Sequence, residues 1–306
     1  MPGRDRDLQE RLDGLETESW NADGADLDLR STDELVALMN AEDRTVPGAV
    51  ASAAPAIGAA IDEIASRLRG GGRLIYVGAG TSGRLAELDA AECEATFSAR
   101  PGQVTALVAG GAEGSPLEQE AAEDDADAGA REAEALGISA ADAVVAISAS
   151  GRTPYVLGAL SAAASAGALT VCLVSVRDSE LARVAKHEIA VPVGPEFLAG
   201  STRLKAGTSQ KLVLNMISTI SMIRLGKTFG NLMVDVQPAN EKLEARVRRI
   251  VCLATGAPSD EAGEALAAAG GDPKTAIVSI LAGIDAETAR ARLVAAGGSV
   301  RGALAP

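Results

Sequence analysis

Aromatic residues are almost absent from this sequence of 306 residues, because phenylalanine, tyrosine and tryptophan together make up only 2%. Aliphatic side chains must therefore fill the core, and neither a stacking surface for single-stranded nucleic acid nor an aromatic sugar-binding platform is expected. Cations are also too few to balance the acids, since 28 lysines and arginines stand against 42 aspartates and glutamates. The net charge of −14 repels nucleic acid and anionic membranes. An anionic small ligand would have to be held by local hydrogen-bond donors.

Histidine and cysteine are scarce as well. The single histidine, His187, argues against a histidine-based metal site, and the three scattered cysteines form neither a disulfide framework nor a paired zinc motif. The first seven residues contain no apolar run of the kind that a signal peptide needs. The uncharged stretch 153–176 breaks at Gly167 before a β-rich run, which indicates a buried helix and a buried strand rather than a membrane span. We therefore expect a cytoplasmic protein without a metal.

Short apolar strands alternate with helices from residue 70 onward, which is typical of an α/β protein with a parallel, doubly wound sheet. Five strands are expected, at Leu74–Val77, Val104–Val108, Ala143–Ile147, Leu169–Val174 and Ile189–Val193. Upstream, Ser31 and Glu34 form a capping box, and an Ala/Ile-rich helical stretch follows over Val46–Leu68. Ligands of such sheets bind at the carboxyl ends of the strands, so the residues directly after each strand are the site candidates.

The C-terminal segment repeats itself, since Gly270-Gly271 recurs 27 residues later as Gly297-Gly298. Two short helical hairpins in tandem account for this pattern, with Asp272 as a helix cap and Pro273 at the first helical position. We expect three regions: a helical segment over 1–65, the α/β domain over 66–229, and a helical region over 230–306. The last region carries no residues in a catalytic pattern and is expected to pack or to bind partners.

Two loops rich in glycine and hydroxyl groups follow the first and third expected strands. The first contains Gly80, Thr81 and Ser82, and the second contains Ser148, Ser150, Gly151 and Thr153. Glycines let backbone N–H groups converge at a helix N-terminus, which is where phosphate groups bind. The first loop also fits the three-glycine dinucleotide fingerprint, and either loop alone fits a tight strand–helix turn. Two such loops in one sheet predict a single phosphate that is held from both sides.

A third segment, 194–211, leads into a long helix and carries two cations near its start. Arg203 and Lys205 stand where positive charge does not complement the helix dipole. Their position predicts an anion nearby, and solvated helix charges are the alternative.

These segments resemble one family of proteins. The two hydroxyl loops resemble those of the sugar isomerase (SIS) domain. The 194–211 segment resembles the signature shared by N-acetylmuramic acid 6-phosphate etherases and the glucokinase regulatory protein. Further stretches that resemble the etherases are Leu27–Leu29, Asn40–Asp43, Gly70–Arg84, Ser150–Val156 and Gly230–Val236. The resemblance spans roughly residues 15–306 and implies an SIS-type sheet, N-terminal helices, a UBA-like C-terminal region and a homodimer.

The resemblance also implies a reaction and two catalytic residues. Etherases cleave the lactyl ether of N-acetylmuramic acid 6-phosphate, a phosphorylated amino sugar, to N-acetylglucosamine 6-phosphate and D-lactate, without a cofactor. A base that removes the C2 proton and an acid that protonates the departing oxygen suffice. The family's pattern places the acid at Glu92, in Asp89-Ala90-Ala91-Glu92-Cys93. It places the second carboxyl group at Glu123, in the acidic helix that contains Ala121-Ala122-Glu123-Asp124.

One departure from the family's pattern follows Cys93, where Glu94-Ala95 replace a common pair of prolines. This replacement loosens the expected loop and makes Glu94 a rival of Glu92. An unbroken helix from Ser82 would place Glu92 roughly 15 Å from the phosphate end. Either the helix ends early, or Glu92 serves a neighbouring subunit. Two other functions stay open: a non-catalytic sugar-phosphate-binding regulatory protein, and an SIS-type aldose–ketose isomerase with a different base.

Overall fold

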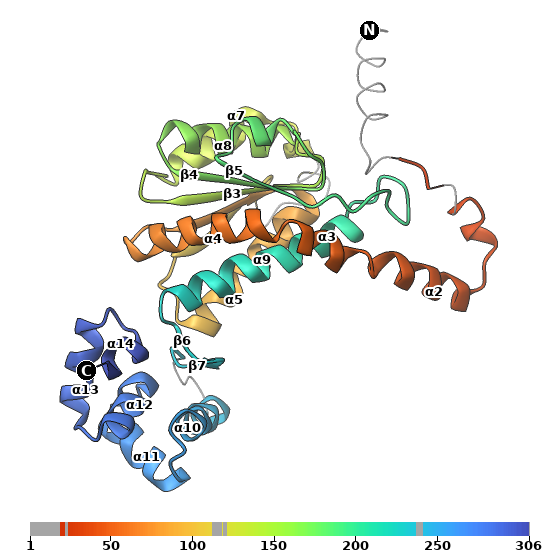
Figure 1. Cartoon of the computed structure of the whole chain (residues 1–306). Coiled ribbons are helices and arrows are strands. Elements are labelled where there is room, and N and C mark those ends of the chain that lie inside the picture. Colours follow the sequence, from red (N-terminus) through yellow and green to blue (C-terminus); the bar gives the residue numbers. More distant parts are fainter. Residues whose placement is uncertain (1–18, 22–23, 112–117, 119–120, 237–240, 306) are drawn as a thin grey trace. The chain divides into compact units, whose positions relative to one another are not determined.

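The computed structural model describes residues 19–21, 24–111, 118, 121–236 and 241–305 (Figure 1). They belong to two compact units. The first unit comprises the chain up to Ala90 together with Gly102–Ile217, and the second comprises Ala91–Pro101 together with the chain from Ser218 onward. Each unit is described by itself below.

A five-stranded parallel sheet forms the centre of the first unit and confirms the expected α/β class. Its strands are β1 (Leu74–Gly78), β2 (Val104–Val108), β3 (Ala143–Ser148), β4 (Leu169–Val174) and β5 (His187–Ala190). They lie in the order β2-β1-β3-β4-β5. Residue Ile75 of β1 pairs with Thr105 on one side and Val144 on the other. The chain runs outward from β1 to β2 and then crosses to β3, so the strand order reverses between β1 and β3.

Strand β5 begins and ends earlier than its sequence predicts. The expected strand covered Ile189–Val193, whereas His187–Ala190 pair in register with Val171–Val174 of β4. The N–H of Val191 still donates to the carbonyl of Val174 at 2.8 Å. Pairing stops there because β4 has ended and Pro192 has no N–H to donate. The end of β5 is therefore set by its partner strand, which a local pattern does not contain.

Helices cover both faces of the sheet (Figure 1). One face carries α7 (Ala126–Ala135) and α8 (Pro154–Ser165), and the other carries α4 (Ala54–Arg69), α5 (Gly80–Phe97) and α9 (Lys205–Arg224). The close packing of α7 on α8 depends on two glycines. A Cβ at Gly129 would clash with the carbonyl of Tyr155, and a Cβ at Gly158 would clash with the backbone of Ala126. Small residues thus let backbones approach in a core that has few aromatic rings.

The expected Ala/Ile-rich helical stretch is two helices, α3 (Val46–Ser52) and α4. The break falls at Ala53 because Pro55, in the first turn of α4, cannot donate to the carbonyl four residues earlier. Ahead of them lie a short 3₁₀ turn, η3 (Leu27–Leu29), and α2 (Thr32–Asp43). The capping box of α2 is confirmed, since Ser31 and Glu34 each accept the other's backbone N–H.

No single helix among the described residues has both the length and the apolar composition of a membrane span. Two segments that meet at a bend, Thr32–Ser52 and Ala54–Arg69, have the length and apolar composition of a membrane span only when they are counted together. This match concerns length and composition alone.

A buried carboxylate joins the amino ends of β1 and β3. Asp142 accepts the backbone N–H of Arg73 at 2.9 Å, its guanidinium Nη2 at 2.8 Å, and the N–H of Ser139 at 3.0 Å. Burial by itself raises the pKa of the Asp142 carboxyl. The hydrogen bonds from Arg73 and Ser139 outweigh burial and hold this pKa below its ordinary value.

Replacement of Asp142 with asparagine is expected to lower the free energy of unfolding by about 1–3 kcal/mol, because the partly exposed Arg73 loses its buried, charged hydrogen-bond partner. The folded-state pKa is depressed, so this contribution is fully present above the ordinary carboxyl value of about 3.9 and is lost as the pH falls through the folded value. Urea denaturation of wild type and Asp142→Asn should therefore converge at low pH. The exposed control Glu134→Gln should change the unfolding free energy by no more than about 0.5 kcal/mol. A difference independent of pH would contradict the role of the ion pair.

The second unit is mainly helical. It contains the short hairpin β6 (Thr228–Phe229) and β7 (Leu232–Met233), followed by α10 (Glu241–Thr255), α11 (Ser259–Ala268), α12 (Pro273–Ala282), α13 (Ala286–Ala295) and α14 (Val300–Leu304). The two copies of the sequence repeat fall on α11 with α12 and on α13 with α14. Asp272 caps α12 and Ser299 caps α14 at the equivalent position. The two Gly-Gly pairs ahead of these caps all have positive φ.

Candidate active site

The loops that follow β1 and β3 open into one hollow of about 230 Å³ in the first unit. It is lined by Ala79, Gly80, Thr81, Ser82, Glu123, Ile147, Ser148, Ala149, Ser150, Thr153 and Thr202. The direct pairing of β1 with β3 brings the two loops together, because parallel strands end at the same edge of a sheet. Both hydroxyl loops that the sequence singles out therefore face the same space.

Two helices have their N-termini at this hollow. Helix α5 starts at Gly80, whose φ is +53°, and α8 starts at Pro154, after Gly151 with a φ of +66°. Helix N-termini carry unpaired N–H groups and partial positive charge, and together these bind anions. None of the described lining residues is a cation. The described lining residues offer an anion backbone N–H groups and hydroxyls, and the Arg84 guanidinium donates to one of these hydroxyls, Thr81 Oγ1, at 3.3 Å.

The second loop contains a chain of hydrogen bonds that ends on Glu123. The N–H of Gly151 donates to Ser148 Oγ at 3.1 Å, the hydroxyls of Ser148 and Thr153 lie 2.9 Å apart, and Thr153 Oγ1 donates to Glu123 Oε1 at 3.0 Å. Thr153 has one hydroxyl proton and gives it to Glu123, so Ser148 is the donor to Thr153. Both hydroxyl residues are buried. The chain holds the Glu123 carboxylate against the loop that is expected to bind phosphate.

Glu123 lies in a turn ahead of α7, not in the expected helix. Its carbonyl accepts the N–H of Tyr155 at 3.0 Å, which ties the turn to the first residues of α8. Its side chain is half-buried and bears the only charge among the described residues that line the hollow. In the sequence Glu123 is one acid among several neighbours, so the residues alone, without the family resemblance, do not single it out.

Glu92 does not line the hollow. Helix α5 is unbroken from Gly80 to Phe97, so the possibility of an early helix end is excluded. Glu92 and Glu94 are both exposed near the end of this helix, and Cys93 between them is buried. The loop expected at Glu94-Ala95 is helical, because these residues have the N–H groups that a pair of prolines would lack.

Arg203 and Lys205 also lie outside the lining of the hollow. Lys205 is buried and its Nζ lies 2.6 Å from Glu42 Oε2, while Arg203 is exposed. The N-terminus of α9 is capped by the buried carboxylate of Glu196, which accepts the N–H groups of Lys205 at 2.9 Å and Ala206 at 3.0 Å. This carboxylate complements the helix dipole, so the two cations do not require an anionic ligand. Thr202, which sequence reasoning missed, lines the hollow instead.

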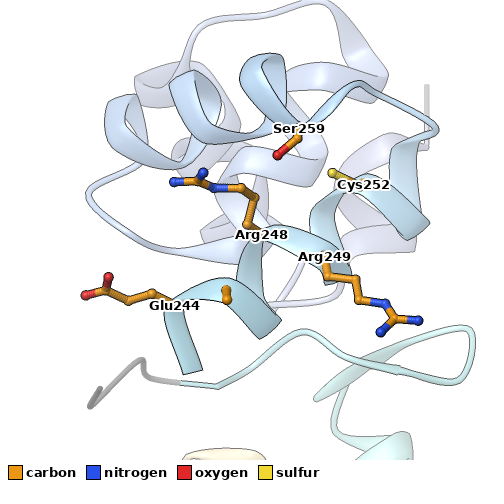
Figure 2. A pocket seen from close by; sticks show the side chains of 6 residues that line it. Glu244, Arg248, Arg249, Cys252 and Ser259 are labelled. Atoms are coloured by element: carbon orange, nitrogen blue, oxygen red, sulfur yellow. The ribbon is translucent and has the colours of Figure 1, made fainter. Parts of the chain in front are cut away.

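A larger hollow of about 560 Å³ lies on α10 and the start of α11 in the second unit (Figure 2). Its lining consists of Glu244, Ala245, Arg248, Arg249, Cys252 and Ser259. The guanidinium groups of Arg248 and Arg249 point away from each other in Figure 2 and do not converge on one ligand. We therefore place the candidate active site in the first unit.

Within the described ranges, no group of three histidine, cysteine, aspartate or glutamate side chains is arranged to hold a metal ion.

The sheet and its hollow define an SIS-domain protein. The family model of the SIS domain matches residues 123–220, and that of the glucokinase regulatory protein N-terminal SIS domain matches residues 56–164.

Relatives match nearly the whole chain. It is 55% identical over 299 residues to the N-acetylmuramic acid 6-phosphate etherase of Streptomyces coelicolor, covering 98% of this chain and 96% of the relative. The etherase of Rubrobacter xylanophilus is 57% identical over 297 residues (97% and 98% covered), and that of Mycolicibacterium smegmatis is 52% identical over 293 residues (96% and 98% covered). The chain therefore belongs to the N-acetylmuramic acid 6-phosphate etherase family.

Proposed function

We propose that this protein cleaves the lactyl ether of N-acetylmuramic acid 6-phosphate and releases N-acetylglucosamine 6-phosphate and D-lactate. The family and the names of its relatives support this reaction. The observation that carries the proposal is the hollow where two anion-binding helix N-termini meet a carboxylate, with Thr153 Oγ1 3.0 Å from Glu123 Oε1. A phosphate held by the loops would present the attached sugar to that carboxylate, so the reacting groups are held near each other before reaction.

The reaction is an elimination followed by an addition of water. In the ring-opened sugar, C2–H is acidic because C2 adjoins the C1 aldehyde. A base takes this proton, the C2–C3 double bond forms, and the C3–O bond breaks with both electrons going to the lactate oxygen. An acid protonates that oxygen. Water then adds its oxygen to C3 and a proton to C2, so atoms and electrons balance without an oxidant, reductant or cofactor.

We assign the removal of the C2 proton and the protonation of the lactate oxygen to two different carboxyl groups. Glu123, in the hollow, is the proposed base for C2, and Glu92 is the proposed acid for the lactate oxygen. The proposed phosphate ligands are Gly80, Thr81, Ser82 and Ser150. Ser148, Gly151 and Thr153 are proposed to frame the site, because their hydroxyl and N–H protons are already donated within the loop and to Glu123. Arg203 and Lys205 are left out of the proposed site, because Lys205 pairs with Glu42 and neither residue lines the hollow.

We propose that the protein acts as a cytoplasmic homodimer, in which Glu92 serves the partner's site. Apolar surface supports the dimer. Helix α2 buries none of its residues, and its Val36 is 60% exposed. On α9, Met216, Ile220 and Ile223 are all exposed at positions that share one face of the helix. A second copy of the chain would remove these side chains from water.

The activity is tested by incubating the protein with N-acetylmuramic acid 6-phosphate and assaying D-lactate with a lactate dehydrogenase. Release of D-lactate with N-acetylglucosamine 6-phosphate as the sugar product is expected. An aldose–ketose isomerase would form a ketose and no lactate. A regulatory protein would bind the sugar phosphate and turn over nothing. Either of these results would overturn the proposed reaction.

Removal of one loop hydroxyl should weaken the binding of a sugar 6-phosphate. Ser82→Ala and Ser150→Ala each remove one hydrogen bond to a charged group, worth roughly 1.5–3 kcal/mol of binding free energy. Calorimetry with N-acetylglucosamine 6-phosphate measures the loss. Ser161→Ala is the matched control, since Ser161 is exposed and donates to its own helix, at the carbonyl of Leu157. Unchanged affinity in both loop variants would disprove the binding of one phosphate by both loops. It would favour the alternative that the first loop binds a dinucleotide, which titration with NAD would test.

A further inference from the structure

Gln210 of α9 lies behind Ser82 and has one polar atom without a partner. The hydroxyl of Ser82 donates to Gln210 Oε1 at 2.9 Å. Gln210 is only 2% exposed, and its Nε2 has no hydrogen-bond partner among the residues that the structure describes. A buried donor left unsatisfied costs about 1–3 kcal/mol, so an amide at this position requires an explanation that packing does not supply.

The single hydroxyl proton of Ser82 explains why an amide is useful at position 210. Ser82 has a single hydroxyl proton, and in this structure that proton points to Gln210 and away from the hollow. Ser82 then presents only lone pairs to the hollow, and lone pairs repel a phosphate oxygen. To bind phosphate, Ser82 has to turn its proton toward the anion, which leaves Gln210 Oε1 without a donor.

Rotation of the Gln210 amide by half a turn resolves this conflict. The rotation brings Nε2 to Ser82 Oγ, where it donates a hydrogen bond, and Oε1 moves to the place that Nε2 occupied. In the present orientation Nε2 has no partner among the described residues, so no hydrogen bond of Nε2 has to break for the amide to rotate. The rest of α9 is held in place, since Glu196 caps its first N–H groups and Lys205 pairs with Glu42.

We propose that Gln210 is a positioning residue that sets the direction of the Ser82 hydrogen bond. Its amide accepts the Ser82 proton when the hollow is empty and donates to Ser82 Oγ when a phosphate is bound. The inference rests on the proposed function, because it requires the phosphate group of the substrate in this hollow.

A double-mutant cycle tests the coupling between Gln210 and Ser82. Calorimetry gives the Kd of N-acetylglucosamine 6-phosphate, and of inorganic phosphate, for wild type, Ser82→Ala, Gln210→Met and the double variant. Ser82→Ala should raise Kd about tenfold or more, and Gln210→Met should raise it by a smaller factor of roughly three to ten. In the Ser82→Ala background, Gln210→Met should leave Kd unchanged, since Gln210 acts only through that hydroxyl.

If the role of Gln210 were purely structural, Gln210→Met would lower the Tm together with the affinity. The proposal predicts that the two effects separate. Methionine has a similar length and removes the unsatisfied donor, so Gln210→Met should keep or raise the Tm while it weakens binding. Ser209→Ala is the matched control, because Ser209 is buried on the same helix and donates to the carbonyl of Ala206. Its Kd should equal that of wild type.

The outcomes separate this inference from the proposed function. If wild type binds neither ligand, the proposed function and this inference fail together. If wild type binds but Gln210→Met has no effect, or the same effect with and without the Ser82 hydroxyl, only the role of Gln210 is overturned.

A measurement on proteins with an intact Gln210 covers the case in which Gln210 variants do not fold. The side-chain amide resonances of Gln210 in the ¹⁵N-labelled unmutated protein should shift when phosphate is added, and should stay in place in Ser82→Ala. Resonances that do not respond to phosphate in the unmutated protein would overturn the proposal.

Discussion

Replacement of Glu123 with glutamine is expected to abolish both the wash-in of solvent deuterium at C2 of the substrate and the release of D-lactate. The variant cannot accept the C2 proton, and without that step the C3–O bond does not break. The loss should reach roughly 10²–10⁴-fold, which is the usual contribution of a positioned general base. Mass spectrometry of the sugar in D₂O measures the exchange, and a coupled dehydrogenase assay measures the lactate.

The same variant should keep its affinity for the product. Glutamine retains an oxygen that can accept the hydroxyl proton of Thr153, so the loop remains supported. The Kd of N-acetylglucosamine 6-phosphate should therefore stay close to the wild-type value. Asp124→Asn is the control, because Asp124 is the exposed neighbour of Glu123 and does not line the hollow. Normal exchange at C2 in Glu123→Gln would exclude Glu123 as the base.

Replacement of Glu92 with glutamine should separate the two proton transfers. Lactate release is expected to fall by roughly 10²–10⁴-fold, since the leaving oxygen loses its proton donor. Exchange of deuterium at C2 should persist in part, because the base is intact. Glu94→Gln is the control and should matter little. A Glu94 variant that loses lactate release while Glu92→Gln retains it would place the acid two residues further along α5.

The proposal that Glu92 acts across a dimer has its own test. Glu92→Gln and Glu123→Gln subunits, each inactive alone, are mixed and allowed to exchange. If Glu92 serves the partner's site, each heterodimer contains one site with both glutamates and regains lactate release. If both glutamates act within one chain, every site in the heterodimer lacks one of them and the mixture stays inactive.

Local rules account for the elements that the sequence by itself determined. The capping box of Ser31 and Glu34 and the cap at Asp272 depend on residues three positions apart. The alternation of apolar strands with helices determined a parallel sheet, because crossover helices between such strands leave them parallel. Since parallel strands end at one edge, the hydroxyl loops after strands one and three were recognisable as candidates before their contacts were known.

Contacts between distant residues account for what only the tertiary structure decided. The order β2-β1-β3-β4-β5 placed β1 beside β3 and so placed both loops on one hollow. Lys205 pairs with Glu42 across 163 positions, and Ser82 meets Gln210 across 128. Apart from the family resemblance, what distinguishes Glu123 from its acidic neighbours is that Thr153 and Tyr155 bind it. Hydrogen bonds of this kind depend on how the elements pack, and packing brings together residues whose spacing in the chain carries no signal of their contact.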